Sequence, residues 1–353
     1  MNAGPGTDSA RLPKIRKPLL SHPEDLHCVV FHVVLMAAYA LAFFLALYDD
    51  GRLVHITGPW SRGAFVLGAA LMLGWCSGIN VGVNFHNHTH RPVFNSLWLN
   101  RWFGRTWTVS GGWPAYFWRH AHVVVHHADL LGAGDWTLPR RKKDGSFENP
   151  YWYSIATWPW RYSAALWRDF RGGRGGRRVG REALVELLIF AALWSIPFFV
   201  DPLFALGLWV LPQWLANAAV VGPGMYAQHA GCVPKSEERP YEHSNTYLSR
   251  FFNLTMFNIG YHIEHHDHPL VHWSALPALH QRMKGELIAK RAHVLDCGYY
   301  RAGQLLCRGV FSEDARQEFA RQHPAYVAPV TGAGDAGAEC VPSAGPDAAR
   351  IPS

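Results

Sequence analysis

The sequence predicts an all-α integral membrane protein with four transmembrane helices in two hairpins, capped by a cytosolic helical domain that holds a histidine-rich metal site. Three observations lead to this prediction. Four apolar stretches are long enough to cross a bilayer, the 21 histidines are clustered, and tryptophan occurs 16 times. Tryptophan rings are enriched where a membrane meets water. The mean hydropathy of -0.06 averages the apolar stretches with long polar segments, so it does not oppose a membrane location.

The apolar stretches each contain about 18–22 residues, enough to cross ~30 Å of hydrocarbon at about 1.5 Å per residue. They are residues 28–48, 64–85, 183–200 and 203–221. The link 49–63 joins the first pair, and only Asp201 and Pro202 join the second pair. Helices joined by such short links run antiparallel, which gives two hairpins.

The distribution of positive charge sets the expected orientation. The polar segment 86–182 contains 15 Lys and Arg, whereas the link 49–63 contains only Arg52 and Arg62. Cytoplasmic loops carry the excess of Lys and Arg. We therefore expect both termini and the active site to lie in the cytoplasm. The membrane is expected to be a bacterial inner membrane. The arginines of 168–181 are assigned to anionic lipid headgroups, and nucleic-acid binding is not expected.

We expect one membrane domain, residues 25–325, between two tails. Residues 1–24 and 326–353 are rich in Gly, Pro, Ala and Ser and are predicted to be disordered. Two runs that interleave aromatic rings with arginine, 98–107 and 151–167, are predicted to lie along the membrane surface.

The histidines gather in three boxes and one isolated position. The first box ends the second apolar stretch, the second box follows in the polar segment, and the third lies beyond the fourth stretch. Together they offer nine candidate metal ligands: His86 and His90; His122, His126 and His127; the isolated His229; and His262, His265 and His266.

The spacing within the boxes suits metal binding. Residues three or four apart share one face of a helix, so a helical box directs its imidazoles toward one point, as for His86 with His90 and His122 with His126. Neutral imidazole is a suitable ligand for iron and similar metals. Nine ligands are too many for one ion and fit two. Burying so many polar rings near a bilayer without a function would be costly.

The pattern H-x-x-x-H, H-x-x-x-H-H and H-x-x-H-H resembles the membrane fatty acid desaturase superfamily over about residues 60–290. The segment 258–269, NIGYHIEHHDHP, is similar to third boxes of sphingolipid desaturases and carotenoid ketolases. Asp135, within LGAGDWT, is placed as in the sphingolipid branch. The resemblance implies that the nine histidines hold two non-haem iron ions, with O2 as co-substrate.

The resemblance also implies the reaction and its partners. The expected activity is O2-dependent desaturation of a fatty acyl chain or related lipid, with no catalytic residues beyond the metal ligands. Because the sequence has no fused electron-transfer motif, electrons should come from a separate ferredoxin- or cytochrome b5-like donor and its reductase. Ligating imidazoles usually donate their second N–H to a nearby oxygen. The candidates for that contact are Asp129, Asp135, Asn258, Glu264 and Asp267.

Two alternatives remain open at this stage. A hydroxylase or ketolase acting on a lipid or carotenoid would share the fold, the metal and the ligands. A metal transporter is more distant: Ser77, Asn80 and Asn84 share a stripe on the second apolar stretch, but transporters bind their ions near the bilayer midplane rather than at one face. His88 and His268 have no assigned role, and His120 competes with His122 for a place in the second box.

Overall fold

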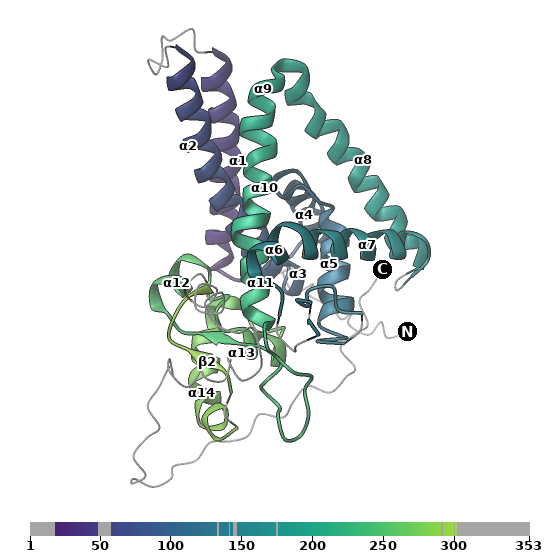
Figure 1. Ribbon diagram of the computed structural model, residues 1–353, viewed down its shortest axis with the longest axis vertical. Coiled ribbons are helices and arrows are strands. Elements are labelled where there is room, and N and C mark those ends of the chain that lie inside the picture. Colours follow the sequence, from purple (N-terminus) through teal and green to yellow (C-terminus); the bar gives the residue numbers. More distant parts are fainter. Residues whose placement is uncertain are drawn as a thin grey trace, which may run out of the picture.

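A computed structural model gives the fold of the protein and describes residues 18–48, 58–132, 134–140, 142–143, 147–173, 176–290, 292–299 and 301. The described chain is mainly helical, as predicted. Long helices project from one end of the molecule, and a smaller body of short helices and two strands forms the other end (Figure 1).

Four helices are long and apolar enough to cross a membrane, which confirms the four predicted spans. Helix α1 is Asp25–Tyr48, and α8 is Gly176–Val200. The other two are composite and continuous, Gly58–His90 and Pro202–His229. The segments of the first are α2 (Gly58–Ile79), η1 (Asn80–Phe85) and α3 (His86–His90). Those of the second are α9 (Pro202–Ala205), η4 (Leu206–Val210), α10 (Leu211–Leu215), η5 (Ala216–Val221) and α11 (Gly222–His229).

The two composite helices are longer than the stretches expected from hydropathy. The predicted span 64–85 continues to His90, and 203–221 continues to His229. Both helices pass through π-helical turns: η1 ends directly before His86, and η5 precedes α11, which ends at His229. Such wide turns re-aim the side chains that follow and occur often at functional sites. The histidines therefore sit on the ends of the long helices themselves.

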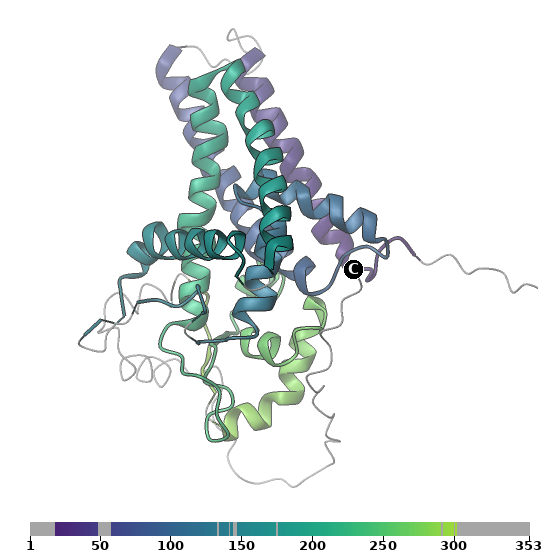
Figure 2. The ribbon, with the colours of Figure 1, turned by 90° about the vertical axis from the view of Figure 1, so that its right-hand side faces the viewer.

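Close helix contact brings these two composite helices together. A Cβ on Gly74 would lie 2.8 Å from Cβ of Leu215, and one on Gly78 would lie 2.6 Å from Cγ2 of Val220. Helix backbones can approach this closely only where a small residue such as glycine lies at the contact. In two views at right angles, α1 runs beside α2, and α8 descends from α9 at an angle (Figures 1 and 2).

Shorter helices lie across the base of the four long ones. They are α4 (Leu97–Gly111), α5 (Ala115–Arg119), η2 (His120–His126), α6 (Pro150–Trp152), η3 (Tyr153–Thr157) and α7 (Trp158–Phe170). Large rings of the two aromatic runs are exposed, including Trp98, Trp102 and Trp160. Exposed apolar rings at this level suit the headgroup region of a bilayer.

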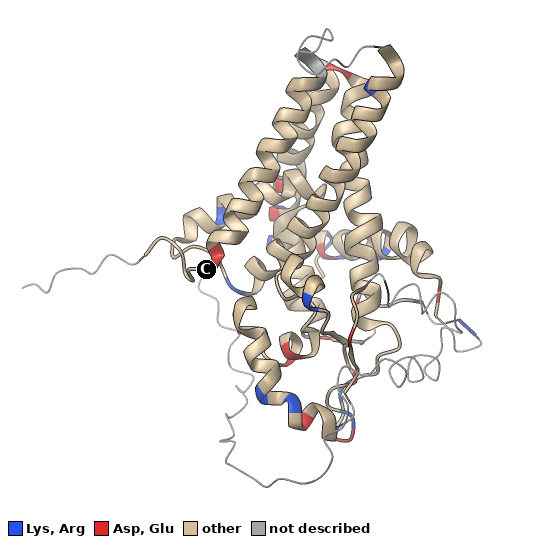
Figure 3. Ribbon diagram, turned by 90° about the vertical axis from the view of Figure 1, so that its left-hand side faces the viewer, with Lys and Arg blue, Asp and Glu red and all other residues tan. Residues whose placement is uncertain are grey.

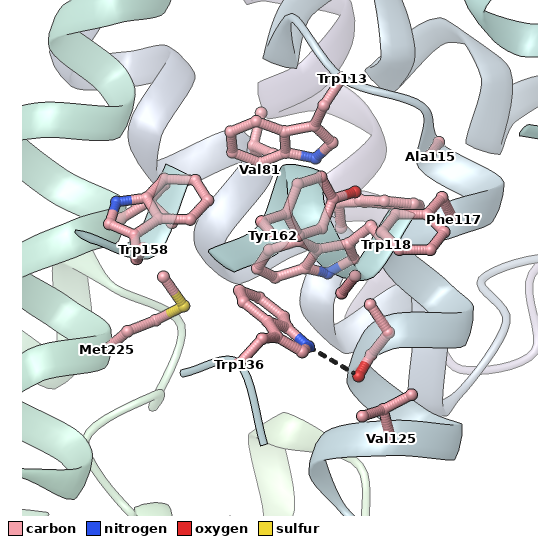
Figure 4. Close-up of a cluster of buried hydrophobic side chains, with 14 of the residues drawn as sticks. Val81, Trp113, Ala115, Phe117, Trp118, Val125, Trp136, Trp158, Tyr162 and Met225 are labelled. Atoms are coloured by element: carbon pink, nitrogen blue, oxygen red, sulfur yellow. Dashed lines mark hydrogen bonds between the residues drawn. The ribbon is translucent and has the colours of Figure 1, made fainter. Parts of the chain in front are cut away.

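A buried aromatic cluster supports the second histidine box. Trp113, Trp118, Trp136 and Trp158 pack around Tyr162 (Figure 4). The indole N–H of Trp136 donates to the carbonyl of Ala121, 3.0 Å away, which ties this cluster to η2.

The C-terminal part of the described chain forms a small body that carries the third box. Strands β1 (Thr246–Tyr247) and β2 (Val294–Leu295) pair in parallel, with Thr246 opposite Val294. The helices around them are α12 (Arg250–Thr255), α13 (His262–Asp267), η6 (Trp273–Ala275) and α14 (Leu276–Ala289). Charged residues gather on this body and on the connecting segments, whereas the long helices carry few, apart from the start of α8, which contains Arg177, Arg178, Arg181, Glu182 and Glu186 (Figure 3).

Part of the predicted N-terminal tail is ordered. Leu20 forms an antiparallel bridge with Phe94, and the backbone N–H of Ser21 donates to the carbonyl of Val93 at 2.8 Å. This strand-like pairing places Leu20 and Ser21, which lie within the predicted tail 1–24, against the chain just after the first histidine box. Residues 1–17 and the predicted tail 326–353 lie outside the described residues.

Candidate metal centre

All nine predicted ligands come together in two adjacent groups. In each group, the potential ligand atoms lie within 4.8 Å of one another. The first group consists of His86, His90, His122, His127 and His265, and the second of His126, His229, His262 and His266. The groups share a border, where the rings of His127 and His266 stack with centroids 4.2 Å apart.

The second box is divided between the two groups, contrary to our expectation. We expected His122 and His126 to share a face on an α-helix, but residues His120–His126 form a π-helix. The N–H of His127 bonds to the carbonyl of His122 at 2.9 Å, and the Nε2 atoms of these two residues are 3.1 Å apart. The wider turn therefore pairs His122 with His127 and turns His126 toward the other group.

The third box is divided in the same way. His262 and His266 are one α-helical turn apart on α13, and their Nε2 atoms lie 3.1 Å apart in the second group. His265 points to the first group, where its ring centroid is 4.5 Å from that of His90. The isolated His229 joins the second group, with its Nε2 atom 3.2 Å from that of His262.

The chemistry of these nitrogens fits metal ions. Burial, followed by the charges of neighbouring histidines, lowers the pKa of His122, His127, His262, His265 and His266 well below the usual range, so these rings are neutral. Among the described residues, the buried Nε2 atoms of His86, His90 and His265 have no hydrogen-bond partner. Two nitrogens bound at right angles to one ion, each about 2.1 Å from it, lie about 3 Å apart, which matches the separations of 3.1 and 3.2 Å.

Asp135 is a predicted carboxylate that contacts a ring of the cluster. Its two oxygens lie 3.1 and 3.0 Å from Nδ1 of His126, which leaves Nε2 of His126 as the ligand atom. Burial acts to raise the pKa of Asp135, but the charge and hydrogen bond of His126 outweigh it and hold that pKa well below the ordinary value. Thr137, which the sequence did not single out, donates to Asp135 at 2.7 Å and lies 3.2 Å from the same ring nitrogen.

Two further rings are oriented by contacts with residues that were not among the predicted partners. Nδ1 of His229 donates to the carbonyl of His243 at 3.3 Å, and Nδ1 of His86 lies 3.4 Å from Oδ1 of Asn87. Because every residue has a backbone carbonyl, the contact with His243 could not be predicted from residue types. Asn87, in contrast, lies within the first box and has a polar side chain, so its contact could have been predicted.

The other four residues that were predicted to contact a ligating imidazole bond to other groups instead. Glu264 bonds to His280 and accepts from Thr246, and Asp267 bonds to Lys235 at 2.7 Å. Asn258 donates to the carbonyl of Trp273, and Asp129 accepts from the N–H of Gly134. These contacts fix the segments that carry the boxes. Asp267 also lies 3.3 Å from Nε2 of His243, the residue whose carbonyl orients His229.

The histidines without an assigned role lie outside both groups. Nε2 of His120 is 2.9 Å from a carboxylate oxygen of Asp169 on α7, and both side chains are buried. Nδ1 of His88 accepts from the N–H of Val93 at 3.3 Å, and its ring packs on Trp107. The structure therefore places His122, not His120, in the histidine cluster. His268 is in neither group.

Comparison with known families agrees with this arrangement. The family model described as fatty acid desaturase matches residues 62–296, which include all three boxes and His229. The chain belongs to the fatty acid desaturase family. It is therefore an oxidoreductase and a membrane protein of the lipid-desaturating kind.

Several relatives are named sphingolipid delta(4)-desaturase DES1. The desaturase is 24% identical to the one from Gallus gallus over 285 residues, which cover 77% of this chain and 80% of the relative. It is 26% identical to the Mus musculus protein over 276 residues, or 76% of each chain. No solved structure matches the chain.

An apolar cavity of the desaturase reaches both histidine groups. Its lining includes His86 and His122 of the first group and His126 and His229 of the second. The rest is mainly apolar, formed by α2, η5, α11 and the segment 252–259. Gln228, Tyr299 and Thr137 are the polar exceptions, and Nε2 of Gln228 donates to the hydroxyl of Tyr299 at 2.5 Å. A hydrocarbon chain in this cavity would lie directly beside the histidine nitrogens.

Proposed function

We propose that the nine histidines hold two iron ions and that the enzyme desaturates a lipid hydrocarbon chain with O2. The observation that carries this proposal is the apolar cavity that ends at both histidine groups. When bound, the iron ions would supply the O2 activation that removing hydrogen from an unactivated methylene requires. Five histidines would serve one ion and four the other.

The chain's own residues would bind and position the substrate. The apolar walls of the cavity would exclude water and hold two adjacent methylenes near His86 and His126. Asp135 would keep the His126 ring in one tautomer and one orientation. The polar pair Gln228 and Tyr299 would face a polar end of the lipid, which suits a substrate resembling those of the sphingolipid desaturases.

We further propose that two hairpins enter the membrane from the cytoplasmic side, with both termini and the centre in the cytoplasm. The bias of Lys and Arg toward the end that carries the histidines supports this orientation. A separate ferredoxin- or cytochrome b5-like donor, reduced by its own reductase, would supply the electrons. The basic cytoplasmic surface favours an acidic donor.

Expression in a bacterial host with a ferredoxin or cytochrome b5 and its reductase tests this function. Cells fed long-chain bases or fatty acids would be compared by lipid mass spectrometry for the wild type, His266→Ala and the exposed control His27→Ala. We expect a product lacking two hydrogens with the wild type and His27→Ala, and none with His266→Ala. A product that gains oxygen would identify a hydroxylase, and a product that survives His266→Ala would refute the proposed centre.

A further inference from the structure

A second, polar pocket reaches the centre from a different side. It touches His90 and His265, both of the first histidine group, whereas the apolar cavity touches His86 and His122 of that group. Its other walls come from the start of α1, from Asn87 and Arg91, and from the segment 269–276. The two openings therefore differ in chemistry, one suited to hydrocarbon and one to polar species.

Besides Nε2 of the candidate ligands His90 and His265, three buried polar atoms in the walls of this pocket have no hydrogen-bond partner among the described residues. They are Oδ2 of Asp25, Nδ2 of Asn87 and Nε1 of Trp273. Asp25 is only 2% exposed. One acceptor and two donors around a small polar space match the hydrogen bonds of a buried water, which makes about three such bonds.

The orientation of Asp25 is set by His272, which is also buried. Nδ1 of His272 accepts from the N–H of Ser274, so a neutral His272 carries its proton on Nε2. That nitrogen is 3.0 Å from Oδ1 of Asp25 and donates to it. The second oxygen, Oδ2, is thereby left to face another donor. The ring of His22 stacks on His272 with centroids 3.8 Å apart, and the side chain of His22 is 32% exposed. His22 therefore separates the His272–Asp25 pair from solvent on this side.

Desaturation needs such a polar route. Each turnover follows R–CH2–CH2–R′ + O2 + 2 H⁺ + 2 e⁻ → R–CH=CH–R′ + 2 H2O, where the electrons come from the external donor. Two protons must reach the centre from solvent and two waters must leave it. A lipid chain that fills the apolar cavity blocks that path, and protons do not cross hydrocarbon.

We propose that the pocket between Asp25, Asn87 and Trp273 binds ordered water and is the route by which protons reach, and water leaves, the His90 and His265 side of the centre. This inference rests on the proposed function. Asp25 is a positioning residue in it, because it orders the water and does not touch the lipid.

Hydration of the pocket can be measured without turnover. Hydrogen–deuterium exchange at imidazole C2, read by mass spectrometry on the detergent-solubilised full chain, compares His272 with His280, which are 4% and 1% exposed. Each of these two rings is paired with a buried carboxylate, Asp25 for His272 and Glu264 for His280. We expect His272 to exchange about fivefold faster or more, because it adjoins a hydrated pocket. Equal protection of the two rings would overturn the proposal.

Turnover of Asp25→Asn tests the route itself. We expect bound metal to match the wild type and the unfolding temperature to fall modestly, because His272 keeps a weaker partner, while turnover falls about tenfold or more and its solvent deuterium isotope effect rises. Trp273→Phe, which retains the ring packing against Phe257, should give a smaller decrease. Glu238→Gln, an exposed carboxylate, is the control.

Wild-type turnover in both Asp25→Asn and Trp273→Phe would refute the route. An inactive wild type would instead refute the proposed function, and the exchange measurement would still decide whether the pocket holds water.

Discussion

The carboxylate of Asp135 bonds to Nδ1 of His126 through both of its oxygens, at 3.1 and 3.0 Å, and both side chains are buried. This contact fixes the ring that the π-helix turns toward the second histidine group. Removing such a contact typically costs about 10–100-fold in metal affinity or activity. We therefore expect Asp135→Asn to fold, to lose metal from the second group at limiting iron, and to lose activity by a similar factor.

Metal analysis of the purified variant, with lipid product measured in parallel, checks this prediction. Glu238→Gln serves as the matched loss of one carboxylate at an exposed position. Full metal content and full activity in Asp135→Asn would show that the contact does not support the centre.

The second box offers a direct test of which histidines bind metal. His122 belongs to the first group, whereas His120 contacts Asp169 on α7. We expect His122→Gln to lose about one metal ion per chain. His120→Gln should retain both ions and lose about 1–3 kcal/mol of stability, because Asp169 is left buried with a weaker partner. Metal content and thermal unfolding of both variants separate the roles, and the reverse pattern would assign His120 as the ligand.

The clustering of the nine histidines followed from the sequence, whereas the division of the cluster did not. All nine histidines and Asp135 could be named because their residue types and clustering are unusual. The division into groups of five and four could not be predicted, because the expectation for His122 and His126 assumed 3.6 residues per turn and η2 has a wider turn. His243 acts through its backbone carbonyl, so its residue type carried no signal.

The membrane helices also show that the sequence predicted the presence of elements better than their detailed geometry. Hydropathy located all four long helices but ended two of them too early, because His86–His90 and Gly222–His229 are helical without being strongly apolar. Local composition indicates where a segment is apolar. It does not indicate where helical hydrogen bonding ends once neighbouring helices bury the polar side chains.

Two glycines on α2 provide a matched pair for testing the cavity wall. A Cβ on Gly78 would collide with Val220, and both residues line the cavity, whereas a Cβ on Gly68 meets nothing within 4 Å. Gly78→Ala should lower stability by about 1–3 kcal/mol through overpacking. Gly68→Ala should be neutral or stabilising by up to about 1 kcal/mol, because alanine favours a helix.

Thermal unfolding in one detergent and product profiles for lipids of different chain length check both variants. The expected result is a change of chain-length preference for Gly78→Ala alone. If the two variants behave alike, the contact between Gly78 and Val220 does not shape the cavity.

Buried neutral histidines predict how the metal-free protein responds to acid. The pKa values of His122, His127, His262, His265 and His266 are lowered by burial and by the neighbouring histidines of the cluster, whereas in the unfolded chain they return to about 6.5. Below that pH, the unfolded state binds more protons than the folded state, so stability falls as the pH falls. Each such histidine contributes up to about 1.4 kcal/mol per pH unit.

The unfolding temperature of the metal-free protein should therefore fall steeply between about pH 6.5 and 5.5 and change little between about pH 7.5 and 8.5. Replacing His265 and His266 by glutamine, which does not titrate, should make the acid response shallower. His27→Gln, at an exposed position, should leave it unchanged. A pH response that is the same in all three proteins would mean that the clustered rings are already protonated in the folded state. Protonated rings cannot bind metal, so this result would contradict two groups of neutral metal ligands.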